Sequence, residues 1–290
     1  MRVTSFDKYN MSQYRLSQLQ QYSNNLQIQM SSGKAYQKIS ESPVKANASL
    51  LVGTGITKIE QFQSNLEDLQ GYVQTSESYL ASAVDDYQRA MELGVQAANG
   101  TYNDQDRESF KLELNSLIEH MVGVGNSQHL GKYLFAGQEN NVKPLDYDGT
   151  TVTYNGSPTV NSIRISSNME VPVSVTAQDA FAGTIQAMIG LRDAISTGVS
   201  SNVGPAMSTL QTQGENLLDA RSDMGVRMST VDMVSKSYEQ NKIELQTKKS
   251  KVEDADAAEV IMQFMNAQQL YQGTIQATLK MYESSLLNYM

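Results

Sequence analysis

The sequence predicts a mainly α-helical fold with a small β-rich insert in the middle of the chain. Both ends carry long hydrophobic repeats whose spacings alternate between three and four residues, whereas strand-like patterns occur only between them. Prolines agree with this division, since none occurs between residues 44 and 143 or after Pro205. Amphipathic ends of this kind need to be buried, either against each other or against other copies of the chain.

The first predicted helix spans residues 8 to 31. Its repeat has seven members: Tyr9, Ser12, Leu16, Leu19, Ser23, Leu26 and Met30. The sequence Ser31-Ser32-Gly33 then offers a glycine helix end. A loop is expected up to Pro43, and a bend at Gly53–Gly55 before the next helix.

The longest repeat predicts a helix of roughly 60 Å, at about 1.5 Å per residue. Twelve positions keep one register: Ile59, Phe62, Leu66, Leu69, Val73, Ser76, Leu80, Ala83, Tyr87, Ala90, Gly94 and Ala97. Such a sustained heptad is typical of a coiled-coil helix with a left-handed supercoil.

A further helix is expected after Asn103 or Asp104, either of which is a suitable N-cap. We also place His120 and His129 on this helix. Nine residues would direct them to opposite faces, so a shared metal is not expected and both histidines are interpreted as structural.

The middle of the chain changes to a two-residue periodicity. Turn signals at Tyr147-Asp148-Gly149 and Tyr154-Asn155-Gly156 separate short alternating runs, and Val171–Val175 has the pattern of an edge strand. The insert is predicted to span 40 to 50 residues. A short helix over Phe181–Ser196 should follow, and the chain should be helical from Met207 nearly to its end.

The last predicted helix carries two adjacent hydrophobic repeats and should be buried on more than one side. One contains Val260, Phe264, Ala267 and Tyr271, and the other contains Ile261, Met265, Ile275, Leu279, Tyr282 and Leu286. Residues 1 to 50 hold six basic and two acidic side chains (+4), whereas residues 251 to 290 hold two and five (−3). Opposite charges favour pairing of the two ends.

Composition excludes several classes of protein. The chain has 290 residues, no cysteine, no tryptophan and a net charge of −9, so a disulfide framework, a thiolate metal site and general nucleic-acid binding are not expected. We find no secretory signal pattern near Met1 and no apolar run long enough to cross a membrane.

Catalytic motifs are missing as well. The acidic run from Glu253 to Glu259 lacks the glycine and the final glutamate of a calcium loop, and Gly53-x-Gly55 follows no strand. No nucleophile elbow or catalytic triad is present. We therefore expect neither an enzyme nor a bound cofactor or metal.

Three motifs resemble bacterial flagellins. Leu26-Gln27-Ile28-Gln29-Met30-Ser31-Ser32-Gly33-Lys34 is similar to a stretch near their N-terminus. Val252-Glu253-Asp254-Ala255-Asp256-Ala257-Ala258-Glu259 is similar to a motif near their C-terminus. Gly131-Lys132-Tyr133-Leu134-Phe135-Ala136-Gly137 resembles the signature of the hook–filament junction members of that family. One departure is Ser40-Glu41-Ser42-Pro43, where the family commonly has paired aspartates before the proline.

The resemblance implies a flagellin-like architecture with three domains. The terminal helices (residues 1–45 and 250–290) would pair in a coiled-coil inner domain. A long-helix bundle (46–135 and 197–249) would follow, and residues 136–196 would form a β-rich outer domain. Because two paired helices offer little burial against ordering costs, we expect residues 1 to 40 and 255 to 290 to exchange amide hydrogens readily in a monomer.

The resemblance also implies partners and a location. The chain would be exported by the flagellar type III pathway to the extracellular flagellum. There it would form a ring of copies at the hook–filament junction, in contact with the other hook-associated junction protein and with flagellin, without binding nucleic acid or membrane. On the N-terminal helix the assembly residues are predicted to be Leu16, Leu19, Leu26 and Met30. An export chaperone and assembled neighbours would share a surface on the C-terminal helix: Val260, Ile261, Phe264, Met265, Tyr271, Ile275, Leu279, Tyr282 and Leu286.

Two other structural functions fit the same features. The first alternative is filament flagellin itself, and the second is a coiled-coil protein secreted by a non-flagellar type III system. The Tyr-Leu-Phe-Ala-Gly motif and the modest size of the insert favour the junction over the filament.

Overall fold

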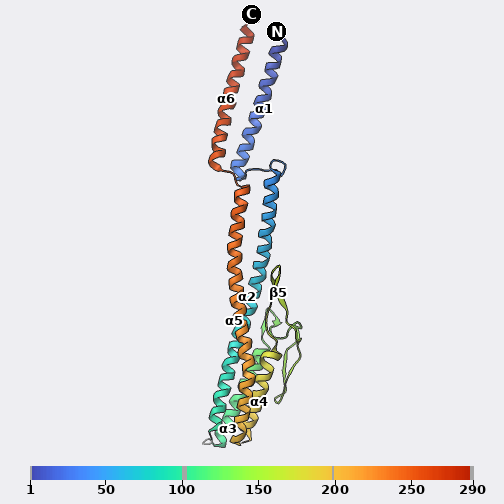
Figure 1. The fold of residues 1–290 in the computed structure, drawn as a ribbon, viewed down its shortest axis with the longest axis vertical. Coiled ribbons are helices and arrows are strands. Elements are labelled where there is room, and N and C mark those ends of the chain that lie inside the picture. The colour runs from blue at the N-terminus through green and yellow to red at the C-terminus, as the bar shows by residue number, and fades with distance from the viewer. Residues whose placement is uncertain (1, 100–102, 198, 288–290) are drawn as a thin grey trace. The chain divides into compact units, whose positions relative to one another are not determined.

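The computed structural model describes residues 2–99, 103–197 and 199–287, and side-chain detail is confined to residues between 7 and 280. Helices dominate the chain, and the strands form a cluster in its middle (Figure 1). In order, the elements are α1 (Arg2–Ser32), α2 (Pro43–Ala98), α3 (Asp104–Gly125), β1 (Gln128–His129), β2 (Lys132–Tyr133), β3 (Leu145–Tyr147), β4 (Val152–Tyr154), β5 (Ser162–Ser166), β6 (Met169–Pro172), the π-helical turn η1 (Gln178–Ala182), α4 (Gly183–Ser196), α5 (Ser200–Glu253) and α6 (Ala257–Leu287).

The chain divides into two compact units. The first unit, which we call the terminal unit, comprises the chain up to Lys58 and the chain from Asn241 onward. The second, the bundle unit, comprises Ile59–Gln240. The finer division into three domains stays a prediction.

In the terminal unit, α1 and α6 lie side by side and run antiparallel (Figure 1). Gly33 ends α1 with a φ of 69°, and its N–H donates to Gln29 O at 2.8 Å. This left-handed conformation suits glycine, which confirms the predicted helix end.

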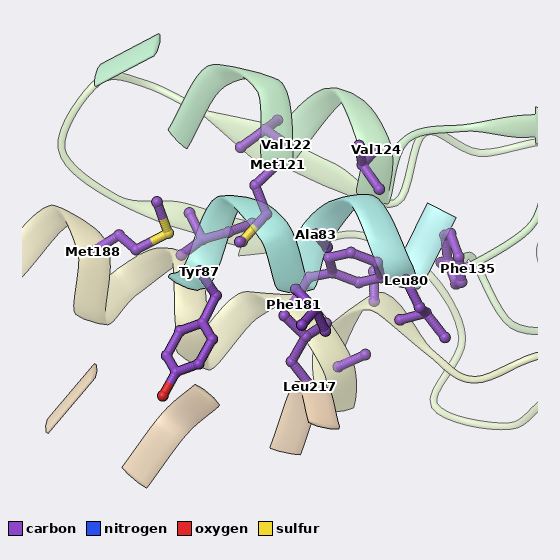
Figure 2. Packing of buried hydrophobic residues seen from close by; sticks show 14 of the residues in the cluster. Leu80, Ala83, Tyr87, Met121, Val122, Val124, Phe135, Phe181, Met188 and Leu217 are labelled. Atoms are coloured by element: carbon purple, nitrogen blue, oxygen red, sulfur yellow. The ribbon is translucent and has the colours of Figure 1, made fainter. Parts of the chain in front are cut away.

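In the bundle unit, the predicted heptad of α2 is confirmed by burial. Ten of its positions, from Leu66 to Ala97, are buried, and the first two, Ile59 and Phe62, are half-buried. Figure 2 shows Leu80, Ala83 and Tyr87 of α2 among side chains from α3, α4 and α5. The matching core positions of α5 are spaced by seven residues: Val203, Leu210, Leu217, Met224 and Val231. The core of this unit therefore has coiled-coil periodicity along both long helices.

Of the two candidates that the sequence offers, Asn103 is the N-cap of α3. The Asn103 side chain accepts a hydrogen bond from Asp106 N at 2.9 Å, and the Asp106 carboxylate accepts one from Asn103 N at 3.2 Å. This reciprocal capping box satisfies two N–H groups that have no partner inside the helix.

Two boundaries differ from the prediction. The Gly53–Gly55 segment does not bend the chain, since α2 is one helix from Pro43 to Ala98. Each glycine there lowers helix propensity by only about 1 kcal/mol, which packing along a long helix overrides. Helix α5 begins at Ser200 rather than Met207, so Pro205 lies inside its second turn. There the proline removes only one hydrogen bond near the helix start.

The strands in the described residues form three separate antiparallel hairpins rather than one sheet, and the first of them, β1–β2, lies before the predicted insert. Asp148 organises the turn between β3 and β4 by accepting hydrogen bonds from Thr150 N and Thr151 N. These two backbone donors are the largest causes that hold the pKa of its carboxyl far below the usual range.

Two arginines fasten the hairpins to the helices. Arg192 of α4 donates to Gly149 O at 2.9 Å, and Arg227 of α5 donates to Ser174 O at 2.7 Å. Both side chains are largely buried, so their charges are committed to holding backbone carbonyls in place. The hairpin region is therefore held against α4 and α5 of the bundle unit by these hydrogen bonds.

The two histidines lie on different elements, which corrects the sequence interpretation. His120 is on α3 and pairs with the Asp86 carboxylate at 2.7 Å. His129 is in β1, where its Nδ1 lies 3.2 Å from Thr75 Oγ1 and its ring packs on Tyr72. Helix α3 ends at Gly125, before His129. The prediction that the two histidines occupy opposite faces of one helix was therefore wrong. Their interpretation as structural residues agrees with these contacts.

Candidate assembly surface

One side of α6 packs against α1. Leu26 of α1 forms a small buried cluster with Val260 and Ala267 of α6, and Phe264 packs beside it. Tyr271 and Ile275 are half-buried farther along the helix. We call Val260, Phe264, Ala267 and Tyr271 the inner stripe of α6; the prediction that this repeat is buried holds within the chain.

A second side of α6 is apolar and exposed. Ile261, Met262, Met265 and Leu279 are between 44% and 64% exposed, and we call them the outer stripe. Leu270 is 60% exposed. It follows Ile261 by nine residues, which correspond to about 900° of helix rotation, so it lies on the side of α6 opposite to Ile261. Sequence analysis missed Met262 and Leu270, because neither falls in a heptad register. Helix α6 thus exposes apolar side chains on both sides of its contact with α1.

The predicted residues of α1 have two different environments. Leu16 and Leu19 are half-buried on the same face as Leu26. Met30 is 43% exposed, so it does not take part in the cluster with α6. Tyr282 and Leu286 lie outside the residues whose side chains are described. As assembly residues, all of these positions stay predictions.

The two terminal motifs meet in space at the base of the α1–α6 pair. Lys34 and Asp254 form an antiparallel β-bridge, in which Ala35 N donates to Glu253 O at 2.7 Å and Ala255 N donates to Gly33 O at 2.9 Å. The Lys34 ammonium lies 3.4 Å from the Glu253 carboxylate. Residues 220 positions apart in sequence thus form one structural joint, which we call the motif joint.

Charges in this joint have defined partners. The Glu253 carboxylate accepts a hydrogen bond from Ser49 Oγ, and that bond is the largest cause that lowers its pKa. Glu41, at the position where the family pattern changes, accepts hydrogen bonds from Gln37 N and Lys38 N, which lower its pKa and close the loop before α2. Asp256 accepts from Ala258 N and Glu259 N at the start of α6. Within the acidic run, Asp256 therefore caps α6 and Glu253 pairs with Lys34.

Family models match both ends of the sequence. Residues 7–140 match the bacterial flagellin N-terminal helical region, and residues 207–290 match the bacterial flagellin C-terminal helical region. Together these matches cover most of the chain, in the order and on the helices just described. The chain belongs to the flagellin family.

Relatives of this flagellin-family chain include both filament and hook-associated proteins. It is 25% identical to a flagellar filament 30.7 kDa core protein of Treponema maltophilum, over 87% of each chain. It is 22% identical to flagellar hook-associated protein 3 of Salmonella typhimurium, over 97% of this chain and 96% of the relative.

Solved structures share the fold. Bacillus cereus FlgL aligns with a TM-score of 0.62 and 18% identity, over 69% of this chain and 99% of that one. The flagellar junction protein FlgL from Legionella pneumophila aligns with a TM-score of 0.60 and 14% identity, over 72% and 100%. The mainly helical, flagellin-like fold predicted from the sequence is thereby confirmed.

In this flagellin-family chain, the Gly131–Gly137 motif packs the hairpin region against the bundle core. Phe135 is fully buried and packs edge-to-face on Phe181, with ring centroids 4.9 Å apart. Gly137 has a φ of 69°, and a Cβ there would collide with Ser157 O and lie 2.6 Å from Thr159 O. Packing therefore requires this motif, and the close approach of the backbone at Ser157 and Thr159 requires glycine at position 137.

The same motif begins in an unusual turn. Leu130 and Gly131 have φ values of 50° and 77° and form the two-residue connection between β1 and β2. Positive φ at both positions is typical of a type I′ turn, which favours Asn-Gly. Leucine in the left-handed region costs roughly 1–2 kcal/mol. Leu130 is the single non-glycine residue with positive φ among the residues described.

Proposed function

We propose that this chain forms the junction zone between hook and filament of the bacterial flagellum and templates filament assembly. The observation that carries this proposal is the end-to-end similarity to a hook-associated protein 3, which leaves almost no part of either chain unmatched. The Gly131–Gly137 motif, which resembles the signature of the junction members and is buried from Leu134 to Ala136, supports it. The chain then acts mechanically, without catalysis.

The proposed mechanism rests on how little the terminal helices bury within one chain. The α1–α6 pair has a small cluster around Leu26, whereas the outer stripe and Leu270 remain exposed. Burying the exposed side chains against neighbouring copies contributes about 25 cal/mol per Å² of apolar surface. Assembly therefore supplies the burial that a single α1–α6 pair lacks.

The partners follow from this position. Copies of the chain form a ring, with the other hook-associated junction protein on one side and flagellin on the other. Before assembly, an export chaperone covers α6, and the chain is secreted by the flagellar type III pathway. These partners share one requirement, an apolar helix that is accessible until the final contact forms.

The decisive test is the location of the chain and the phenotype of its loss. Antibody-labelled hook–basal bodies should carry a single band at the distal end of the hook. A null strain should retain hooks while releasing flagellin into the medium. Label along the whole filament, or a null strain that secretes no flagellin, would contradict the junction proposal.

The filament subunit is the second candidate, because a filament core protein is 25% identical over 87% of both chains. In that case the label would run along the filament, and the null strain would keep hooks that carry their junction proteins but would release no flagellin. Since the chain belongs to the flagellin family, the non-flagellar secreted protein has lost its support.

The outer stripe can be tested separately from overall charge. Met265→Asp places a charge at the centre of the outer stripe and should reduce assembly and chaperone binding at least tenfold. Gln269→Asp, one turn along the same helix, adds the same charge without removing an apolar side chain. Equal loss for both variants in a pull-down and assembly assay would contradict the role of the outer stripe.

A further inference from the structure

Leu130 is an exposed apolar side chain held in an unfavourable backbone conformation. It is 85% exposed at the tip of the β1–β2 turn, the highest exposure among the large apolar residues of the described chain. Asparagine would suit this type I′ position better and would also be more soluble there. A residue that is poor for both the turn and the solvent indicates a contact outside its own chain.

The same unit contains a pocket that could receive such a side chain. It has a volume of about 440 Å³ and lies between α5 and the loops on either side of the β5–β6 hairpin. Pro158, Val160, Val175 and Ala220 supply its apolar wall. Since Leu130 is exposed, it does not fill this pocket in its own chain.

Charges beside the two features are complementary. Lys132, two residues after Leu130, is exposed on the hairpin. The pocket carries Asp179, Asp219 and Asp223, and its one cation, Arg227, is bound to Asp223 and to two backbone carbonyls. The pocket is thus net acidic and the hairpin tip basic, which suits an approach with Lys132 at the rim.

The hairpin and the pocket lie at the same level of the bundle unit. His129 anchors the hairpin to Thr75 of α2. Glu77 of α2 forms a 3.1 Å ion pair with Arg221 of α5, which is adjacent to Ala220 in the pocket wall. The hairpin, which contacts α2, and the pocket, which is lined by α5, therefore lie within about one helical turn of each other along the bundle.

We propose that Leu130 of one copy inserts into the Ala220 pocket of a neighbouring copy at the same level, with Lys132 facing the acidic rim. The contact joins two different surfaces, so a row of copies has a free hairpin at one end and a free pocket at the other, and closure of the row pairs these two surfaces. Repetition at one level gives a ring rather than a closed dimer. The identity of the occupant as a second copy rests on the proposed function.

Cross-linking tests the contact directly, because the natural chain has no cysteine. Full-length chains with Leu130→Cys and Ala220→Cys, assembled on hooks and treated with a short bismaleimide, should give a ladder of dimers, trimers and larger oligomers. The control pair is Leu112→Cys with Ala220→Cys, since Leu112 is 62% exposed on α3; it should stay monomeric. Normal assembly without the Leu130–Ala220 ladder would overturn the contact.

A substitution series measures its strength without risking the fold. Leu130→Asn should keep or raise the melting temperature, because Asn-Gly suits the turn, yet weaken self-association at least tenfold. Leu112→Asn should leave association unchanged. Lys132→Glu should weaken association, and adding Asp219→Lys to the same chain should restore it. Full association of Leu130→Asn, or no rescue by the double variant, would overturn the proposal.

The outcomes separate this inference from the junction function. A ladder in material labelled along the whole filament would support the contact and contradict the junction. A band at the hook end without the ladder would support the junction and contradict the contact.

Discussion

The terminal unit and the bundle unit are both helical, but they differ in how much each buries. In the terminal unit, the α1–α6 pair shares a small cluster of Leu26, Val260 and Ala267. In the bundle unit, four helices and the hairpins share one continuous core. Ordering a residue costs about 1–2 kcal/mol of backbone entropy, so a lone pair of helices is marginal whereas a bundle is not. The bundle unit therefore buries its apolar faces within one chain, whereas the terminal unit leaves apolar side chains of α6 exposed.

The largest expected effect comes from core deletion in the bundle unit. Phe135→Ala should lower the free energy of unfolding by about 3–5 kcal/mol, because it removes a fully buried ring. The matched variant Phe264→Ala, in the α1–α6 cluster, should leave the main urea transition almost unchanged. Equal losses for the two variants would show that the two units unfold together and would contradict the difference in their burial.

A backbone test of the bundle unit should give a smaller loss. Gly137→Ala should destabilise it by about 1–3 kcal/mol, because φ is positive and a Cβ meets backbone oxygens. Gly123→Ala is the control: it lies in α3 with nothing within 4 Å of a Cβ and should stabilise the helix by about 0.5–1 kcal/mol. Thermal melts of both variants check the prediction, and a stabilised Gly137→Ala protein would contradict the close packing of the motif.

The smallest expected effect is the pH dependence of the motif joint. The hydrogen bond from Ser49, with help from nearby lysines, lowers the pKa of Glu253 below 4.5 in the folded chain. Its contribution is therefore present above pH 4.5 and is lost as the pH falls through the folded value. The protection factors of the Ala35 and Ala255 amides should fall over that range.

Ser49→Ala sharpens this test. It removes the main cause of the shift and should weaken the joint by about 1 kcal/mol at neutral pH, with a smaller change on acidification. Lys248→Ala, which breaks an exposed pair with Glu244, serves as the control and should change joint exchange little. An acid response that persists unchanged in Ser49→Ala would contradict this assignment.

Periodicity predicted the bundle unit well and the joints poorly. The heptad from Leu66 to Ala97 specified a buried face, because long helices repeat one local rule many times. The motif joint of Lys34 with Glu253 was not foreseen, since a bridge between residues so far apart has no local signature. His129 was placed on a helix because the short β1–β2 hairpin has too few residues to show a strand period.

The burial pattern of α6 was predicted in part for the same reason. The inner stripe follows a heptad, so Val260 and Phe264 were expected to be buried. Met262 and Leu270 fall outside any register and emerged only from their exposure. The pocket at Ala220 depends on how the loops around β5 and β6 lie on α5, which sequence spacing does not encode.

Hydrogen exchange on the full-length chain tests the central contrast most directly. In a monomer verified by sedimentation, amides of α1 and α6 should exchange rapidly, whereas those of α2 between Leu66 and Ala97 should be strongly protected. On assembly, α1 and α6 should become protected as well. Strong protection of both helices in the verified monomer would contradict the claim that assembly, rather than the single chain, completes the burial of the terminal unit.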